Sequence, residues 1–267
     1  MKKALLWRIA PADGGRESYL FGTMHVRDLR AFGWLDLAQT YIDRCDLFAT
    51  EFDFLEADGA ALAQVMQLPE GQTLDKMLKP GPWKMLDHYT QKKLGIPAEA
   101  LRGQHPMSIS TLLTTAVLME EATQSLDETL WQYARTAGKT TCGVESFEDQ
   151  LQTIGKIPFA THLKSLNWLL RHYGRQKKQM RKMMRWYQAG NILQLYRSSK
   201  KDAKGMRKVL LYDRNATMVQ RFIELTREGS LFCAVGAGHL AGQKGMLRLL
   251  KKAGFKVSAC TEPTKPF

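Results

Sequence analysis

The chain has 267 residues, of which 44% are hydrophobic, and it carries a formal net charge of +13. A chain of this size buries a sizeable core without disulfides. Its four cysteines are widely spaced and form no CxxC pair, which argues against a zinc cage or a disulfide framework. No run of about 18 apolar residues is present, which argues against a transmembrane helix. The composition therefore predicts a soluble globular protein.

The N-terminus superficially resembles a signal peptide, because Lys2 and Lys3 precede a short apolar run. Arg8 interrupts that run and no A-x-A cleavage site follows, so the segment fits the first strand of the fold better. We therefore expect the chain as given to be cytoplasmic, or exported if a leader has been removed.

The first motif follows a short apolar strand, residues 19–21, and reads Gly22-Thr23-Met24-His25. A glycine at a strand end lets the backbone turn sharply, so His25 is expected to project from the edge of a sheet. A helix predicted over residues 35–44 leads into a second strand, residues 47–50, which ends at Glu51. A carboxylate after a buried strand is costly unless it is paired, protonated or bound to a cation. For one glutamate alone, a surface acid is the simpler interpretation.

The middle of the chain reads as mainly helical. Residues 56–138 contain several helix-like stretches broken by Gly and Pro turns, and Ser125-Leu126-Asp127-Glu128 matches a capping box at the start of the last of them. A strand over residues 140–144 follows and ends at Glu145. For Glu145 alone, the simpler interpretation is a charge at the start of the next helix, which Ser146 would cap.

The net positive charge lies in one segment. Residues 163–210 contain 14 Lys or Arg against one acid, Asp202, and the rest of the chain is neutral. A solvated helical surface is the simpler interpretation, and the functional one is a surface that docks an acidic partner or an anionic membrane. No helix-turn-helix, zinc-finger or RNA-binding signature is present, so nucleic acid is not the expected partner.

A second copy of the motif, Gly236-Ala237-Gly238-His239, follows the strand over residues 231–235. With 21 Gly and 6 His, GxxH is expected by chance about 0.5 times, so the shared position after a strand makes the pair informative. A helix over residues 240–253 and a strand over 255–257 would complete a strand-helix-strand unit. The other four histidines lie in predicted helices or turns and are interpreted as structural.

Four predicted strands thus end in His25, Glu51, Glu145 and His239. Ligands of open α/β sheets bind at the carboxyl ends of strands, so these residues are candidates for metal ligation or proton transfer. The fold class is predicted to be α/β, with one mixed sheet assembled from the N- and C-terminal segments in a single domain over residues 1–267. Helical insertions at about 55–138 and 148–210 would form one wall of a cleft, the second insertion being strongly basic.

Several segments together resemble the TraB/GumN family, which includes the Tiki proteins: LWRI, SYLFGTMHV, FATEFD, CGVESFEDQL, YDRNATM and LFCAVGAGHLAGQKGMLRLLKKAGFKV. The resemblance extends from about residue 5 to 258. Tiki members are described as metal-dependent proteases that use two GxxH motifs and a glutamate, whereas many bacterial members have no demonstrated activity. The wider superfamily is taken to include erythromycin-esterase-like hydrolases. Six residues match motif positions of the family: His25, Glu51, Glu145, Arg214, Asn215 and His239.

The favoured interpretation is a metal-dependent hydrolase that cleaves a peptide or ester bond. A divalent cation would be held by His25, Glu51 and His239, or by a subset of them with Glu145. Such a cation lowers the pKa of bound water to about 7 and polarises the scissile carbonyl, and the remaining carboxylate would be the general base. Imidazole and carboxylate ligands suit zinc, manganese or iron, and the sequence does not choose among them.

The Arg-Asn pair is assigned to the substrate. Arg214 would stabilise the developing oxyanion or orient a substrate carboxylate, because its planar fork matches such groups, and Asn215 is grouped with it in substrate binding. A structural salt bridge with Asp213 or with one of the glutamates is an equally good interpretation of Arg214.

Two alternatives remain open. In a metal-free esterase, His25 would act as a general base on water while Glu51 held its tautomer. In a non-catalytic module, the same cleft would bind a peptide or signalling molecule, as the TraB branch suggests through its link to shutting down a peptide pheromone. No GxSxG or HExxH motif is present, which argues against a serine hydrolase or a zincin.

Overall fold

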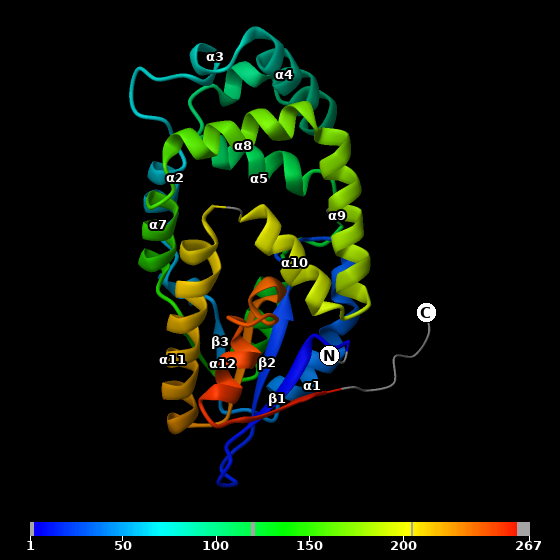
Figure 1. Ribbon diagram of the computed structural model, residues 1–267, viewed down its shortest axis with the longest axis vertical. Helices are drawn as coiled ribbons and strands as arrows, with labels where there is room; N and C mark the ends of the chain where they lie inside the picture. Colours follow the sequence, from blue (N-terminus) through cyan, green and yellow to red (C-terminus); the bar gives the residue numbers. More distant parts are fainter. Residues whose placement is uncertain (1–2, 119–120, 204, 261–267) are drawn as a thin grey trace. The chain divides into compact units, whose positions relative to one another are not determined.

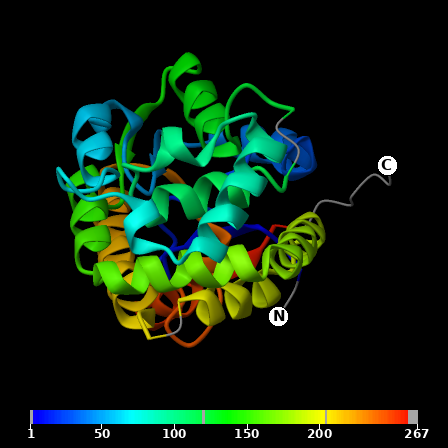
Figure 2. The ribbon, with the colours of Figure 1, turned by 90° about the horizontal axis from the view of Figure 1, so that it is seen from above.

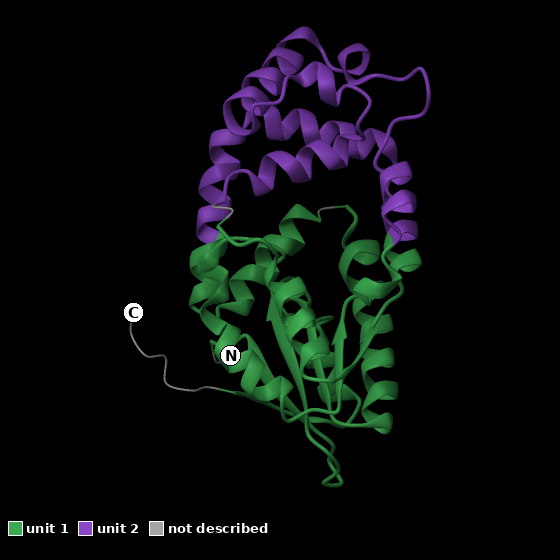
Figure 3. Ribbon diagram, turned by 180° about the vertical axis from the view of Figure 1, so that it is seen from behind, with its two compact units in different colours: residues 1–57, 121–150, 183–267 green, residues 58–120, 151–182 purple. Residues whose placement is uncertain are grey.

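The computed structural model describes residues 3–118, 121–203 and 205–260 (Figure 1). The chain divides into two compact units (Figure 3). The first unit comprises residues 1–57, 121–150 and 183–267, and the second comprises residues 58–120 and 151–182. The second unit falls within the two helical insertions that the sequence indicates. The grouping of the whole chain as one domain, with insertions at about 55–138 and 148–210 that form a cleft wall, stays a prediction.

The first unit contains a six-stranded mixed sheet in the order β4-β3-β5-β2-β1-β6. Its strands are β1 (Leu6–Ala10), β2 (Ser18–Thr23), β3 (Leu47–Thr50), β4 (Thr140–Gly143), β5 (Leu231–Gly236) and β6 (Lys256–Ala259). Strands β4, β3, β5 and β2 are parallel neighbours, whereas β1 is antiparallel to β2 and to β6. N-terminal β2 and C-terminal β5 pair directly, which confirms the predicted α/β class and the mixed sheet built from both ends of the chain.

Helices of the first unit cover this sheet. They are η1 (Leu29–Trp34), α1 (Leu35–Ile42), η2 (Phe54–Glu56), α6 (Leu126–Thr136), α10 (Ile192–Asp202), the π-helical η4 (Lys208–Asp213), α11 (Arg214–Glu228), η5 (Ala237–His239) and α12 (Met246–Lys252). Helix α6 packs against β3, β4 and α1, and α11 packs against β5 and α12. Every residue of β2 is buried, as expected for a parallel strand covered on both faces.

The second unit is helical. It contains α2 (Gly59–Val65), α3 (Leu74–Met77), α4 (Pro80–Leu94), η3 (Ala98–Leu101), α5 (Pro106–Thr115) and α8 (Phe159–Arg171). Helices α7 (Phe147–Gly155) and α9 (Tyr173–Gln188) each contribute residues to both units. Helices α4, α5 and α8 pack together (Figure 2) around the fully buried side chains of Leu86, Ile109 and Leu166. Among the described residues, no helix combines the length and the apolar character that crossing a membrane requires.

Helix starts follow the local chemistry that the sequence indicates. The capping box at Ser125 is present, since its hydroxyl accepts from the Glu128 backbone N–H and the Glu128 carboxylate accepts from the Ser125 N–H. Ser146 and Asp149 make the same reciprocal pair at the start of α7.

The helix predicted over residues 240–253 is wrong at its start, because α12 begins only at Met246. Gly242 has a φ of +96°, which interrupts a helix. At Gly245 an added Cβ would collide with the Ala241 carbonyl oxygen, so the chain is packed too tightly there for a side chain. The turn that follows the second GxxH motif is therefore a loop with two specialised glycines.

Candidate functional site

The candidate site lies where four parallel strands end. His25 follows β2, Glu51 follows β3, Glu145 follows β4 and His239 ends η5 directly after β5. Because these strands are parallel neighbours, their carboxyl ends share one edge of the sheet. The Glu145 N–H donates to the Glu51 carbonyl over 2.7 Å, which extends the pairing of the two strands into the site.

We call His25, Glu51, Glu145 and His239 the histidine–glutamate cluster, and Glu51 lies at its centre. Its Oε1 accepts from the Gly236 N–H over 2.8 Å and lies 3.7 Å from His25 Nε2 and 3.9 Å from His239 Nε2. Its Oε2 lies 2.7 Å from Arg214 Nη2. Burial acts to raise the pKa of Glu51, but the two histidines and Arg214 outweigh burial and hold that pKa well below its usual range. Glu51 is therefore the ionised group that both histidines and the arginine share.

Arg214 bridges the two glutamates. Its Nε lies 3.0 Å from both carboxylate oxygens of Glu145, and its Nη2 lies 2.6 Å from Glu145 Oε2 as well as contacting Glu51. Burial raises the pKa of Glu145, with Arg214 opposing the shift. Burial disfavours the charged guanidinium too, but both carboxylates hold the pKa of Arg214 above its usual value. The salt bridge that the sequence allowed for Arg214 thus involves both glutamates.

His25 is held by a residue that the sequence interpretation missed. Its Nδ1 lies 2.9 Å from Oδ2 of Asp127, whose side chain is 4% exposed while that of His25 is 58% exposed. Asp127 raises the pKa of His25 well above its usual value, and Glu51 adds to the rise. The sequence pattern identifies Asp127 only as part of the capping box at residues 125–128. The available signal was its spacing of three and seven residues from Leu130 and Ala134, which places it on the buried stripe of α6.

His239 is held by a neutral partner. Its Nδ1 lies 2.6 Å from Asn215 Oδ1, and the Asn215 amide donates to the Lys244 carbonyl over 2.7 Å. An amide oxygen only accepts, so Nδ1 carries the proton and Nε2 has a free lone pair toward Glu51. Burial lowers the pKa of His239 to about 4, with Arg214 and His25 acting in the same direction. Both polar groups of Asn215 are thus bonded within the protein, so Asn215 orients His239, and its contact with a substrate stays a prediction.

The donor chemistry of this cluster suits a divalent cation. Metal-ligating histidines usually have their second ring nitrogen held by a carboxylate or carbonyl, and both His25 and His239 do. Both Nε2 atoms also face the same carboxylate, that of Glu51. Within the described part of the chain, however, no group of three or more His, Cys, Asp or Glu is spaced to hold a metal ion as placed.

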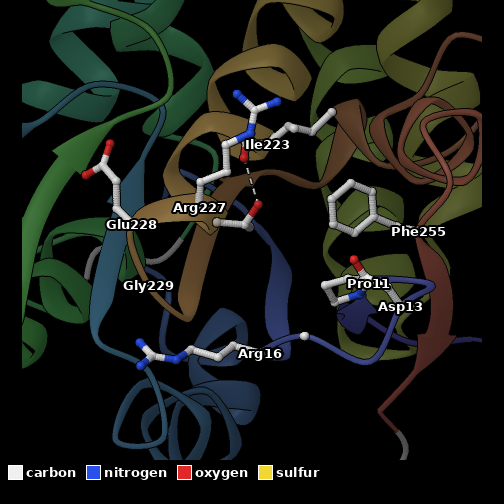
Figure 4. Close-up of a pocket in the computed structure, with 10 residues that line it drawn as sticks. Pro11, Asp13, Arg16, Ile223, Arg227, Glu228, Gly229 and Phe255 are labelled. Atoms are coloured by element: carbon white, nitrogen blue, oxygen red, sulfur yellow. Dashed lines mark hydrogen bonds between the residues drawn. The ribbon is translucent and has the colours of Figure 1, made fainter.

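A separate cavity of about 470 Å³ lies at the opposite edge of the sheet (Figure 4). Residues that precede β2, β5 and β6 line it, among them Arg16, Arg227 and Phe255. None of the residues that line it belongs to the histidine–glutamate cluster, so the two features are independent.

The chain is similar to curated metalloproteases at low identity. It is 24% identical to "Metalloprotease TIKI2" of Danio rerio, an alignment that covers 98% of this chain and 62% of that protein. It is 24% identical to "Metalloprotease TIKI2" of Xenopus tropicalis over 90% of this chain and 57% of that protein, and 23% identical to "Metalloprotease TIKI1" of Danio rerio over 90% and 60%. The chain thus spans about three fifths of the length of these relatives.

No solved structure matches the chain. The model of the TraB/PrgY/gumN family matches residues 5–259, nearly the whole sequence and every member of the histidine–glutamate cluster. The chain therefore belongs to the TraB/PrgY/gumN family.

Proposed function

We propose that this protein is a metal-dependent hydrolase that cleaves a peptide bond. The observation that carries the proposal is the convergence of both motif histidines, each through Nε2, on the Oε1 atom of Glu51. The proteins to which the chain is similar carry the name metalloprotease, which supports the same chemistry. The chain spans only part of those proteins, so the transfer of their activity rests on the experiment below.

His25, Glu51 and His239 would hold the cation, with zinc, manganese or iron as candidates. When bound there, a divalent cation supplies Lewis acidity and lowers the pKa of a water molecule. Glu145 contacts neither histidine, and burial raises its pKa toward the range useful for proton transfer, so we assign it the role of general base.

Arg214 would contact the substrate. Its Nε and Nη2 are engaged by the glutamates, whereas Nη1 makes no hydrogen bond to any residue that the structure describes. A guanidinium has five N–H donors, so Nη1 would be the group that binds a substrate carboxylate or the developing oxyanion. In this scheme Asn215 orients His239, and its neighbour Arg214 makes the contact with the substrate.

A metal-free hydrolase is the second candidate, because His25 is exposed and has a buried carboxylate at Nδ1. In that scheme Asp127, rather than Glu51, holds the tautomer of His25. A binding module without turnover is a third possibility, which the same assay separates.

The basic segment, residues 163–210, would dock an acidic partner. Within the second unit Arg171, Arg175, Lys178 and Lys182 are exposed, and none of them makes an ion pair with a described residue. Such a surface attracts anionic groups in a salt-dependent way. The cytoplasmic location of this docking, or a location outside the cell if a leader has been removed, stays a prediction.

The test is the metal content of the purified protein, measured by elemental analysis for wild type, His25→Ala, His239→Ala and the control His88→Ala, with Zn²⁺ and Mn²⁺ titration where protein is empty. His88 is exposed on α4, in the second unit, and matches the chemical change without touching the cluster. Near-stoichiometric metal that only the His25 and His239 variants lose supports the proposal. Metal retained in either variant, or no binding by wild type, rejects it.

Turnover is tested next on a peptide library with and without the cation. Cleavage that requires the cation and disappears in His25→Ala supports hydrolysis. Saturable peptide binding without product at any metal concentration would identify a binding module instead.

A further inference from the structure

We propose that Asp127 is a positioning residue that sets the orientation of His25. The buried carboxylate would keep the His25 ring with Nδ1 toward helix α6 and Nε2 toward Glu51. Its consequence for metal binding rests on the proposed function, but the orientation itself is a property of the protein alone.

Backbone hydrogen bonds bring Asp127 to His25. The Ala122 N–H donates to the Arg27 carbonyl over 2.9 Å, and the Leu126 N–H donates to the Val26 carbonyl over 3.3 Å. The segment that leads into α6 is therefore tied to the two residues that follow the motif histidine. The capping box then fixes the first turn of α6. Asp127 thus approaches His25 along a fixed backbone path.

The chemistry of the contact determines which nitrogen carries a proton. Asp127 Oδ2 is buried, and its partner among the described residues is His25 Nδ1 at 2.9 Å. A buried carboxylate so close to a ring lone pair would be repelled, so Nδ1 carries the proton. Nε2 is then the nitrogen 3.7 Å from Glu51 Oε1. The His25 side chain is 58% exposed, and its ion pairs with described residues are those with Asp127 and Glu51.

Position at the helix start also favours the carboxylate. Asp127 lies in the first turn of α6, where the helix dipole stabilises a negative charge. Among the described residues Asp127 makes no ion pair with Glu51 or Arg214, so it acts through His25. Replacing a residue that holds a metal ligand in place typically lowers the metal affinity by roughly 10–100-fold.

The first test is ¹⁵N NMR of the histidine side chains without metal, across the pH range in which His25 loses its charge. Wild type, Asp127→Leu and the control Glu128→Gln are compared, with the His25 signals assigned from His25→Gln. Glu128→Gln removes one charge from the same helical turn and keeps a residue that completes a capping box.

We expect neutral His25 in wild type and in Glu128→Gln to carry its proton on Nδ1, and Asp127→Leu, which offers Nδ1 no acceptor, to lose that preference. A wild-type protein with the proton on Nε2 overturns the proposal, as does an Asp127→Leu protein that keeps the wild-type tautomer. The wild-type measurement decides the question even if Asp127→Leu does not fold.

The second test is titration with Zn²⁺ and with Mn²⁺. We expect Asp127→Leu to bind about 10–100-fold more weakly than wild type, and Glu128→Gln to bind equally well. Equal affinity of Asp127→Leu and wild type overturns the role of Asp127 in holding the ligand. If wild type binds neither ion, the proposed function fails while the NMR result still decides the orientation of His25.

Discussion

The two GxxH segments carry the same pattern but build opposite environments for their histidines. The His25 side chain is 58% exposed and its Nδ1 faces a carboxylate, whereas the His239 side chain is 9% exposed and its Nδ1 faces an amide oxygen. The pKa of His25 is raised well above its usual value, chiefly by Asp127, and burial lowers that of His239 to about 4. The partner of Nδ1 and the burial of the ring, and not the motif, decide whether the histidine holds a proton.

The glycines of the two motifs differ as well. In the register of β2 and β5, Gly22 pairs with Val235 and Thr23 pairs with Gly236, so the motifs are offset by one residue. A Cβ at Gly22 would lie 2.6 Å from Leu240 Cδ1, and the Gly236 N–H instead donates to Glu51. One glycine thus serves packing, and the other binds the central carboxylate of Glu51.

Replacing Glu145 tests whether His25, Glu51 and His239 hold the cation without it. We expect Glu145→Gln to slow peptide cleavage by about 10²–10⁴-fold, the usual contribution of a general base, while metal content is unchanged. The measurement is the cleavage rate beside elemental analysis. Loss of the metal together with the activity would place Glu145 among the ligands and contradict its assignment as the general base.

Arg214 supplies the positive charge that the buried glutamates share. We expect Arg214→Met to lower the free energy of unfolding by about 3–5 kcal/mol, because it leaves buried carboxylates without their cation. Urea unfolding at neutral pH with a chelator measures the loss. The exposed control Arg221→Met, which removes a pair on the surface of α11, should cost about 1 kcal/mol or less. Equal costs would contradict the central role of Arg214.

The two histidines should give opposite slopes of stability against pH. His239 has a pKa of about 4 in the folded protein, against an ordinary value of 6.5 for histidine, so the unfolded state binds more protons between these values. Stability is then lost as pH falls from 6.5 toward 4, by at most about 3 kcal/mol. The raised pKa of His25 has the reverse effect, since its contribution is complete below pH 6.5 and is lost as pH rises through the folded pKa.

Urea unfolding of wild type, His239→Asn and His25→Asn between pH 4 and 8, with a chelator present, separates the two contributions. Relative to wild type, the His239→Asn protein should lose less stability on acidification, and the His25→Asn protein should lose less at higher pH. Parallel curves for all three proteins would show that the environments do not differ in this way.

The smallest change converts one environment into the other. In Asn215→Asp a carboxylate replaces the amide beside His239, as at His25, so we expect the pKa of His239 to rise by about 1 unit or more. NMR titration of the His239 ring measures the shift, with Asn167→Asp on α8 as the control for an added charge elsewhere. An unchanged pKa would mean that burial alone sets the protonation of His239.

Local pattern in the sequence by itself determined the strand ends, the two capping boxes and the membership of the family. Short apolar runs that stop at Gly or Glu reflect burial over a few residues, so His25, Glu51, Glu145 and His239 were identifiable as a group. The late start of α12 was not identifiable from the sequence, because Gly242 and Gly245 are required by packing that neighbouring residues do not reveal.

Only the tertiary structure decided the strand order β4-β3-β5-β2 and the partners of each side chain in the cluster. Asp127 reaches His25 across about a hundred residues of sequence, and Arg214 reaches Glu51 across 163. Pairings at such separations depend on how helices pack against the sheet, which no local periodicity encodes. The same dependence on packing explains why two segments that share the GxxH pattern place one histidine beside a carboxylate and the other beside an amide.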